Sequence, residues 1–128
     1  RGRWAEREGT AMSDPLDLRR LDLIRELDPD GSAGLLSRMI DAYGDQSPRQ
    51  VAAIHDAAHE GDLESVASLS HSFKSASANL GAESLRQRAQ RIERAAREKQ
   101  ADEVASQLVG LEAELSRVLR ALRSLIRG

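Results

Sequence analysis

Residues 69–82 read LSHSFKSASANLGA, and this stretch decides both the fold and the site. An α-helix turns by about 100° per residue, which places the apolar and several small residues on one side. That side comprises Leu63, Val66, Leu69, Ser70, Phe73, Ser77 and Leu80. We therefore predict a helix that buries this side and directs His71 outward.

Short side chains surround His71 on the outward side of the predicted helix. The residues three, four or seven positions away are Glu64, Ala67, Ser68, Lys74, Ser75 and Ala78. Most of them are small, so we expect the imidazole to stand above a low surface that a partner approaches closely. We predict that the partner contacts Ala67, Ser68, Ser75 and Ala78.

The spacing of His71, Lys74 and Gly81, H-x-x-K-x-x-x-x-x-x-G, resembles the signature of the histidine-containing phosphotransfer (HPt) domain. Phe73 and Leu80, two and nine residues after the histidine, also match the hydrophobic positions of that family. The likeness runs from about residue 18 to the C-terminus. It implies a helical bundle that relays phosphoryl groups.

Two positions depart from the usual pattern of the family. Ser70 stands just before the histidine, where the family usually has Ala, and Ser75 stands just after the lysine, where Gly is common. Both replacements are small, so the resemblance holds. HPt domains often form the C-terminal end of hybrid sensor kinases, which suggests such a parent for this chain.

The resemblance implies that His71 accepts a phosphoryl group from the aspartyl phosphate of one receiver domain and passes it to the aspartate of another. A neutral imidazole is a good nucleophile toward phosphorus, and an exposed histidine is largely neutral near pH 7. Lys74, one turn further on, is expected to offset the negative charge on the phosphoryl oxygens. Gly81 is expected to permit a left-handed helix end and a tight turn.

A second flank of the site is expected on the next helix. Its residues recur at four and three positions and lie just off the predicted buried stripe: Arg86, Gln90, Glu93 and Arg97. We predict that this strip borders His71 and contacts the partner, with both arginines near the acidic pocket of a receiver. Some family members have a Gln at the place of Glu93 that bonds the histidine; this chain has an acid there.

The composition predicts a single soluble helical domain. The chain has 128 residues, of which 40% are hydrophobic and only 2% aromatic, a composition typical of aliphatic helical bundles. A net charge of −2 argues against non-specific electrostatic binding to nucleic acid. There is no cysteine and no apolar run of roughly 18 residues, so neither disulfides nor membrane insertion is expected.

We interpret residues 1–13 as a linker or a non-native remnant, disordered or loosely ordered, and residues 14–128 as the domain. Five helices are predicted: one from about residue 18 to 28, one to about residue 60 with a kink at Pro48, one ending near residue 81, one over residues 83–99, and one from residue 101 onward. Two separate helices that meet at Pro48 are the alternative to the single kinked one. Short connections favour an all-α, antiparallel up-down-up-down four-helix bundle, with the short N-terminal helix capping one end.

The sequence shows no glycine-rich phosphate loop and no acidic cluster for Mg²⁺, which indicates a relay intermediate rather than an enzyme. No cofactor is expected on this chain, and Mg²⁺ is expected on the receiver. His55 and His59 have no evident third ligand, so we expect no metal.

Ser70 and Ser77 are interpreted as packing residues that bond to their own helix carbonyls. We expect a cytoplasmic monomer whose partners are receiver domains, including those of a parent chain.

Two other functions stay open. A passive helical adaptor would present His71 without using it. A sensor-kinase dimerisation and phosphoacceptor domain is also helical with an outward histidine, but there an acidic residue normally follows the histidine and a Pro stands five positions on. This chain has Ser72 and Ala76 at those positions and no ATP-binding domain, so this alternative ranks lower.

Overall fold

The computed structural model describes residues 15–127, so the linker predicted at residues 1–13 lies outside the described residues. The helices are α2 (Leu18–Glu26), α3 (Leu35–His59), α4 (Leu63–Asn79), α5 (Glu83–Arg97), α6 (Ala101–Leu108) and α7 (Leu111–Arg127). This described part contains no strand, and the predicted all-α class is confirmed. Over the same residues, no helix has both the length and the apolar character needed to cross a membrane.

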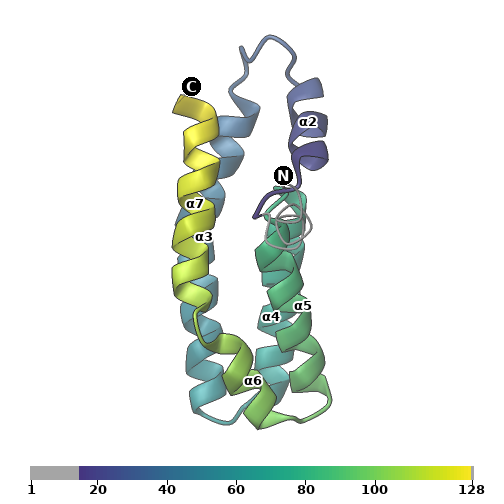
Figure 1. The fold of residues 1–128 in the computed structure, drawn as a ribbon, viewed down its shortest axis with the longest axis vertical. Helices are drawn as coiled ribbons and strands as arrows, with labels where there is room; N and C mark the ends of the chain where they lie inside the picture. The colour runs from purple at the N-terminus through teal and green to yellow at the C-terminus, as the bar shows by residue number, and fades with distance from the viewer. Residues whose placement is uncertain (1–14, 128) are drawn as a thin grey trace, which may run out of the picture.

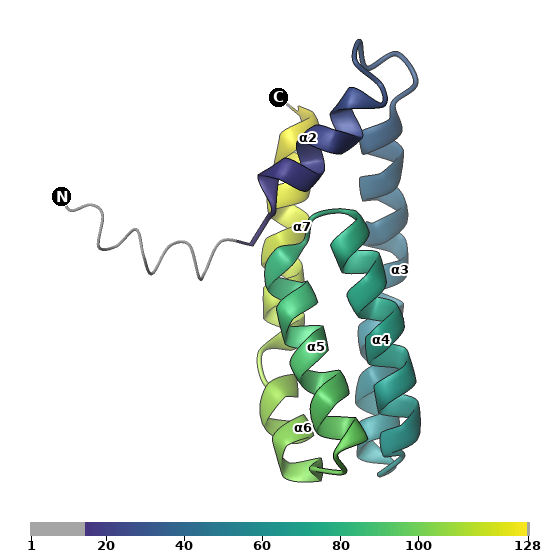
Figure 2. The ribbon, with the colours of Figure 1, turned by 90° about the vertical axis from the view of Figure 1, so that its right-hand side faces the viewer.

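The helices form an antiparallel bundle, shown in two views in Figures 1 and 2. In one layer α3 and α7 lie side by side; in the other α4 and α5 do, and α6 leads from the end of α5 into the column of α7. The chain direction alternates from column to column, as an up-down-up-down bundle requires. The short helix α2 lies across the end where α4 stops and α5 starts, which confirms the predicted cap.

Aliphatic side chains fill the interior, as the low aromatic content predicts. The largest fully buried side chains include Phe73, Leu21, Ile40, Ile54, Leu85, Ile92, Leu111 and Leu122. Phe73 stacks on Tyr43 with ring centroids 6.5 Å apart, and the Tyr43 hydroxyl shares a hydrogen bond of 2.7 Å with Ser77. Burial raises the pKa of the Tyr43 phenol. The Phe73 side of α4 is therefore the buried side, and the opposite side faces out.

Helix α3 continues through Pro48 as one element of 25 residues, which confirms the prediction of a single long helix. Val51 and Ile54 keep the buried stripe on one side of the proline, and Ile40 and Tyr43 keep it on the other. Proline removes one helical N–H donor without changing the phase of the helix. The predicted kink at this position stays a prediction.

The last predicted helix, from residue 101 onward, is wrong as a single element, because it divides into α6 and α7. Val109 is extended (ψ 125°) and Gly110 is left-handed (φ +82°). Arg88 stabilises the break by donating to the carbonyls of Gln107 and Val109, at 2.8 and 3.1 Å, and to Glu114 at 2.6 Å. The free carbonyls at the end of α6 thus find a partner in α5.

Gly81 ends α4 at the point where the start of α2 docks. Its φ is +75°, and its carbonyl accepts a 2.7 Å hydrogen bond from the Asp17 backbone N–H. A Cβ at Gly81 would lie 2.9 Å from the Asp17 carbonyl oxygen and 3.3 Å from Cβ of Arg20. The glycine therefore serves both the left-handed turn and the close approach of α2.

We expect Gly81→Ala to destabilise the fold more than Gly61→Ala. Both glycines have φ +75°, but a Cβ at Gly61 meets nothing within 4 Å, so only Gly81→Ala also disturbs the docking of α2. Denaturant unfolding should show a loss of roughly 1–2 kcal/mol for Gly61→Ala from backbone strain and about twice that for Gly81→Ala. Equal losses would contradict the role assigned to the contact with α2.

Candidate functional site

His71 lies on the outward face of α4, as the helical periodicity predicts. Its side chain is 56% exposed, whereas Phe73 on the opposite face is fully buried. Ser68 and Ser75, one turn before and after it, are exposed and small, and Ala78 is half-buried. The imidazole therefore stands on a low part of the surface.

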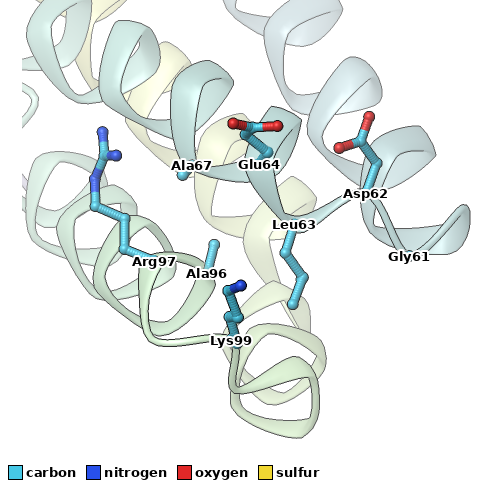
Figure 3. A pocket seen from close by; sticks show the side chains of 8 residues that line it. All are labelled: Gly61, Asp62, Leu63, Glu64, Ala67, Ala96, Arg97 and Lys99. Atoms are coloured by element: carbon cyan, nitrogen blue, oxygen red, sulfur yellow. The ribbon is translucent and has the colours of Figure 1, made fainter.

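The placement of Ala67 on this surface is wrong. Ala67 is only 3% exposed and lies on α4, which packs against α5. Ala67 and Ala96 of α5 line the same pocket, where α4 begins and α5 ends (Figure 3). Ala67 is thus a packing residue between helices rather than a partner contact.

Glu93 of α5 lies beneath His71 and joins it to two cations. Its Oε2 is 3.1 Å from Nδ1 of His71, and its Oε1 is 2.8 Å from Nζ of Lys74. Arg97 donates to the same Oε2 from Nε at 3.0 Å and from Nη2 at 2.8 Å. We call His71, Lys74, Glu93 and Arg97 the Glu93 cluster.

Glu93 borders His71, as predicted for this strip, but it is only 8% exposed, so its predicted role as a partner contact is wrong. The packing of α5 against α4 covers the carboxylate of Glu93. Its partners on α4, His71 and Lys74, offset the free-energy cost of burying this charge. The rest of the predicted strip divides. Arg97 joins the cluster, whereas Arg86 bonds Glu83 at 2.7 Å and Gln90 at 3.0 Å, further toward the start of α5.

The charge state of Glu93 determines which nitrogen of His71 is free. Burial raises the pKa of Glu93, but hydrogen bonds from Lys74, Arg97 and His71 outweigh it and lower the pKa to about 2. A carboxylate only accepts hydrogen bonds, so Nδ1 of His71 carries the proton that it donates to Glu93. In this tautomer Nε2 has a free lone pair, whereas the lone pair of Nδ1–H is part of the aromatic ring.

The two serines on the inner side of α4 are packing residues, as predicted, but their bonding is not the predicted one. Ser77 bonds to the Tyr43 hydroxyl, and the fully buried Ser70 hydroxyl has no partner among the described residues. Among the described residues, neither serine hydroxyl forms a hydrogen bond with a histidine or a carboxylate. Nothing in their surroundings activates them as nucleophiles.

An open pocket lies one turn before His71, where α4 begins and α5 ends (Figure 3). Its rim carries Asp62 and Glu64 on one side and Arg97 and Lys99 on the other, and Figure 3 shows Arg97 extending away from Lys99. The charges are mixed, so the pocket favours neither anions nor cations. Across residues 15–127, no group of three His, Cys, Asp or Glu side chains is placed to hold a metal ion.

Comparison with known proteins agrees with this geometry. Residues 38–121 match a family model described as the Hpt domain. The histidine-containing phosphotransfer protein B (HptB) of Pseudomonas aeruginosa PAO1 superimposes with a TM-score of 0.74 at 25% sequence identity, over 87% of this chain and 93% of that one.

Two plant structures share the fold. The histidine-containing phosphotransfer protein ZmHP2 from maize gives a TM-score of 0.80 at 17% identity, over 96% of this chain and 91% of its own. A putative protein of the same kind from rice gives 0.73 at 16% identity, covering 94% and 88%. A search of curated protein sequences gave no significant match.

The depressed pKa of Glu93 predicts a pH-dependent contribution to stability. An ordinary glutamate titrates near 4.5, while Glu93 stays charged in the folded protein down to about pH 2. The stabilisation by this charge is therefore complete above about pH 5 and is lost as the pH falls toward 2. Glu93→Gln should be less stable than the unchanged protein at pH 7, and urea unfolding should show this gap narrowing between pH 5 and 2. A gap that stays constant would refute the assigned charge.

Proposed function

Because this chain belongs to the Hpt domain family, we propose that His71 carries the phosphoryl group in its phosphorelay. Family membership makes the chain a phosphorelay intermediate rather than an enzyme with its own nucleotide site. The observation that supports His71 is its environment: the ring is 56% exposed and Glu93 engages its Nδ1. That leaves Nε2, with its free lone pair, as the atom proposed to react.

The proposed step is a displacement at phosphorus. The lone pair of Nε2 attacks the phosphorus of an aspartyl phosphate, an N–P bond forms, the P–O bond to the aspartate breaks, and the aspartate leaves as a carboxylate. The ring then carries the phosphoryl group on Nε2 and a proton on Nδ1. In the unphosphorylated chain, Nδ1–H donates a hydrogen bond to Glu93 at 3.1 Å. The reverse step on a second receiver regenerates the neutral imidazole.

Lys74 is the proposed cation for the transferred group. It lies one turn after His71, is 26% exposed, and is held by Glu93 at 2.8 Å. A protonated amine one helical turn from the ring offsets charge on the equatorial phosphoryl oxygens, where charge collects during transfer. Ser68, Ser75 and Ala78 are the proposed contacts with the receiver on the same face, with Arg86 and Gln90 beside them on α5.

Receiver domains are the proposed partners, and they are proposed to supply the Mg²⁺ for transfer. Among the described residues of this chain, no cluster of acidic and histidine side chains fits a divalent cation. We further propose that the domain acts as a cytoplasmic monomer, because a receiver needs the face around His71 uncovered. A parent sensor kinase would bring its own receiver and kinase domains to the same site.

His71→Gln is expected to abolish acceptance of phosphate. Gln matches part of the polarity of His but has no nucleophilic nitrogen, so radiolabel from a phosphorylated receiver should stay on the receiver. His59→Gln, at an exposed position of α3, is the matched control and should accept label like the unchanged protein. Acid-labile, base-stable label on the Gln variant would overturn the assignment, and binding without any transfer in either protein would indicate an adaptor.

Lys74→Ala is expected to slow transfer while the fold stays intact. One charge-assisted contact to the transferred group contributes about 1.5–3 kcal/mol, which corresponds to a rate reduced by roughly ten- to hundredfold. Single-turnover transfer from a phosphorylated receiver measures the rate, and circular dichroism checks the helical content. An unchanged rate would remove the role proposed for Lys74.

A further inference from the structure

Arg97 makes the most extensive contact with Glu93, although it is itself on the surface. Its side chain is 57% exposed, while that of Glu93 is 10% exposed. Both Nε and Nη2 donate to Oε2, the oxygen that also accepts from Nδ1 of His71. Arg97 thus acts on the same carboxylate oxygen that orients the reactive ring.

An ordinary exposed ion pair between residues four apart on a helix contributes little. This pair differs because the acceptor is nearly buried and both guanidinium donors converge on one oxygen, which gives a directed, charge-assisted contact. Lys74 holds the other oxygen at 2.8 Å. Between them, the two cations fix the position of the carboxylate and offset its charge.

Building on the function proposed for His71, we propose that Arg97 is a positioning residue for phosphoryl transfer and acts through Glu93. It holds the carboxylate in the orientation that keeps the proton of His71 on Nδ1 and leaves Nε2 free. It also remains as the counterion of Glu93 when Lys74 turns toward an incoming phosphoryl group, which carries about two negative charges. Without Arg97, Lys74 would be the only cation of the cluster, and Glu93 would retain it.

Direct contact with the receiver is the competing explanation, because Arg97 is exposed. The two explanations differ in how Arg97 couples to Glu93. If Arg97 acts through the carboxylate, its removal matters only while the carboxylate is present, so the two substitutions are not additive. If Arg97 contacts the receiver, the loss is the same with or without Glu93.

The test compares Arg97→Ala, Glu93→Gln and the double variant by single-turnover transfer from a phosphorylated receiver. Arg97→Ala should slow transfer by roughly three- to tenfold, with no further loss when it is added to Glu93→Gln. Arg97→Lys should recover part of the rate, since one amine replaces two donors. Arg94→Ala is the matched control: it removes the same charge from an exposed position of α5, and no hydrogen bond or ion pair within the described chain joins Arg94 to Glu93. It should transfer normally.

A second measurement separates this proposal from the proposed function. Nitrogen-15 NMR of the His71 ring reports which nitrogen carries the proton without any phosphate present. Arg97→Ala should shift the tautomer population toward Nε2–H, while Arg94→Ala should not. If the unchanged protein accepts no phosphate, the function of His71 fails while the NMR result still tests Arg97. Equal slowing in both Glu93 backgrounds, or a ring spectrum unaffected by Arg97→Ala, would overturn the proposal.

Discussion

The close packing of α4 against α5 is the constraint on which the site depends. Ala67 and Ala96 are each 3% exposed at this contact, and such small side chains allow a short distance between helix axes. In this packing a carboxylate from α5 comes within 3.1 Å of His71 and 2.8 Å of Lys74 on α4. A larger residue at Ala67 would move α5 and with it the group that orients the ring. The geometry around His71 therefore results from helix packing rather than from a loop.

The nearly buried carboxylate of Glu93 explains why His71, Lys74 and Arg97 converge on it. A nearly buried charge is unfavourable unless ion pairs and hydrogen bonds offset its lost hydration. Glu93 has such partners on both oxygens, and its pKa of about 2 reflects how far they outweigh burial. These partners therefore keep Glu93 charged. The charged Glu93 in turn holds Lys74 near His71 and accepts the hydrogen bond that places the proton of His71 on Nδ1. One electrostatic requirement of the fold thus also prepares the proposed nucleophile.

The sequence predicts the helices and the outward face of His71 well, because both follow from a hydrophobic period of 3.6 residues. It fails where the rotation of one helix against another matters. Ala67 and Glu93 lie at the edge of their buried stripes, and a glutamate at such a position is exposed by default.

The break at Val109 and Gly110 is missed for a different reason: Leu108 and Leu111 are both buried and three residues apart, the spacing of an unbroken helix. The glycine alone marked the interruption. The docking of α2 on Gly81 joins residues far apart in sequence, which no local pattern reports.

A relay domain has to hold its phosphoryl group loosely enough to pass it on, and the pairing of Lys74 bears on this requirement. In the unphosphorylated chain its ammonium group is already bound to Glu93 at 2.8 Å. On the role proposed for Lys74, accepting a phosphoryl group exchanges one anion for another instead of pairing a free cation. The exchange stabilises the phosphorylated state by the difference between two ion pairs, which is smaller than the contribution of the stronger pair alone. A cation that is engaged before and after transfer therefore keeps the two states close in free energy, and both directions of transfer remain accessible.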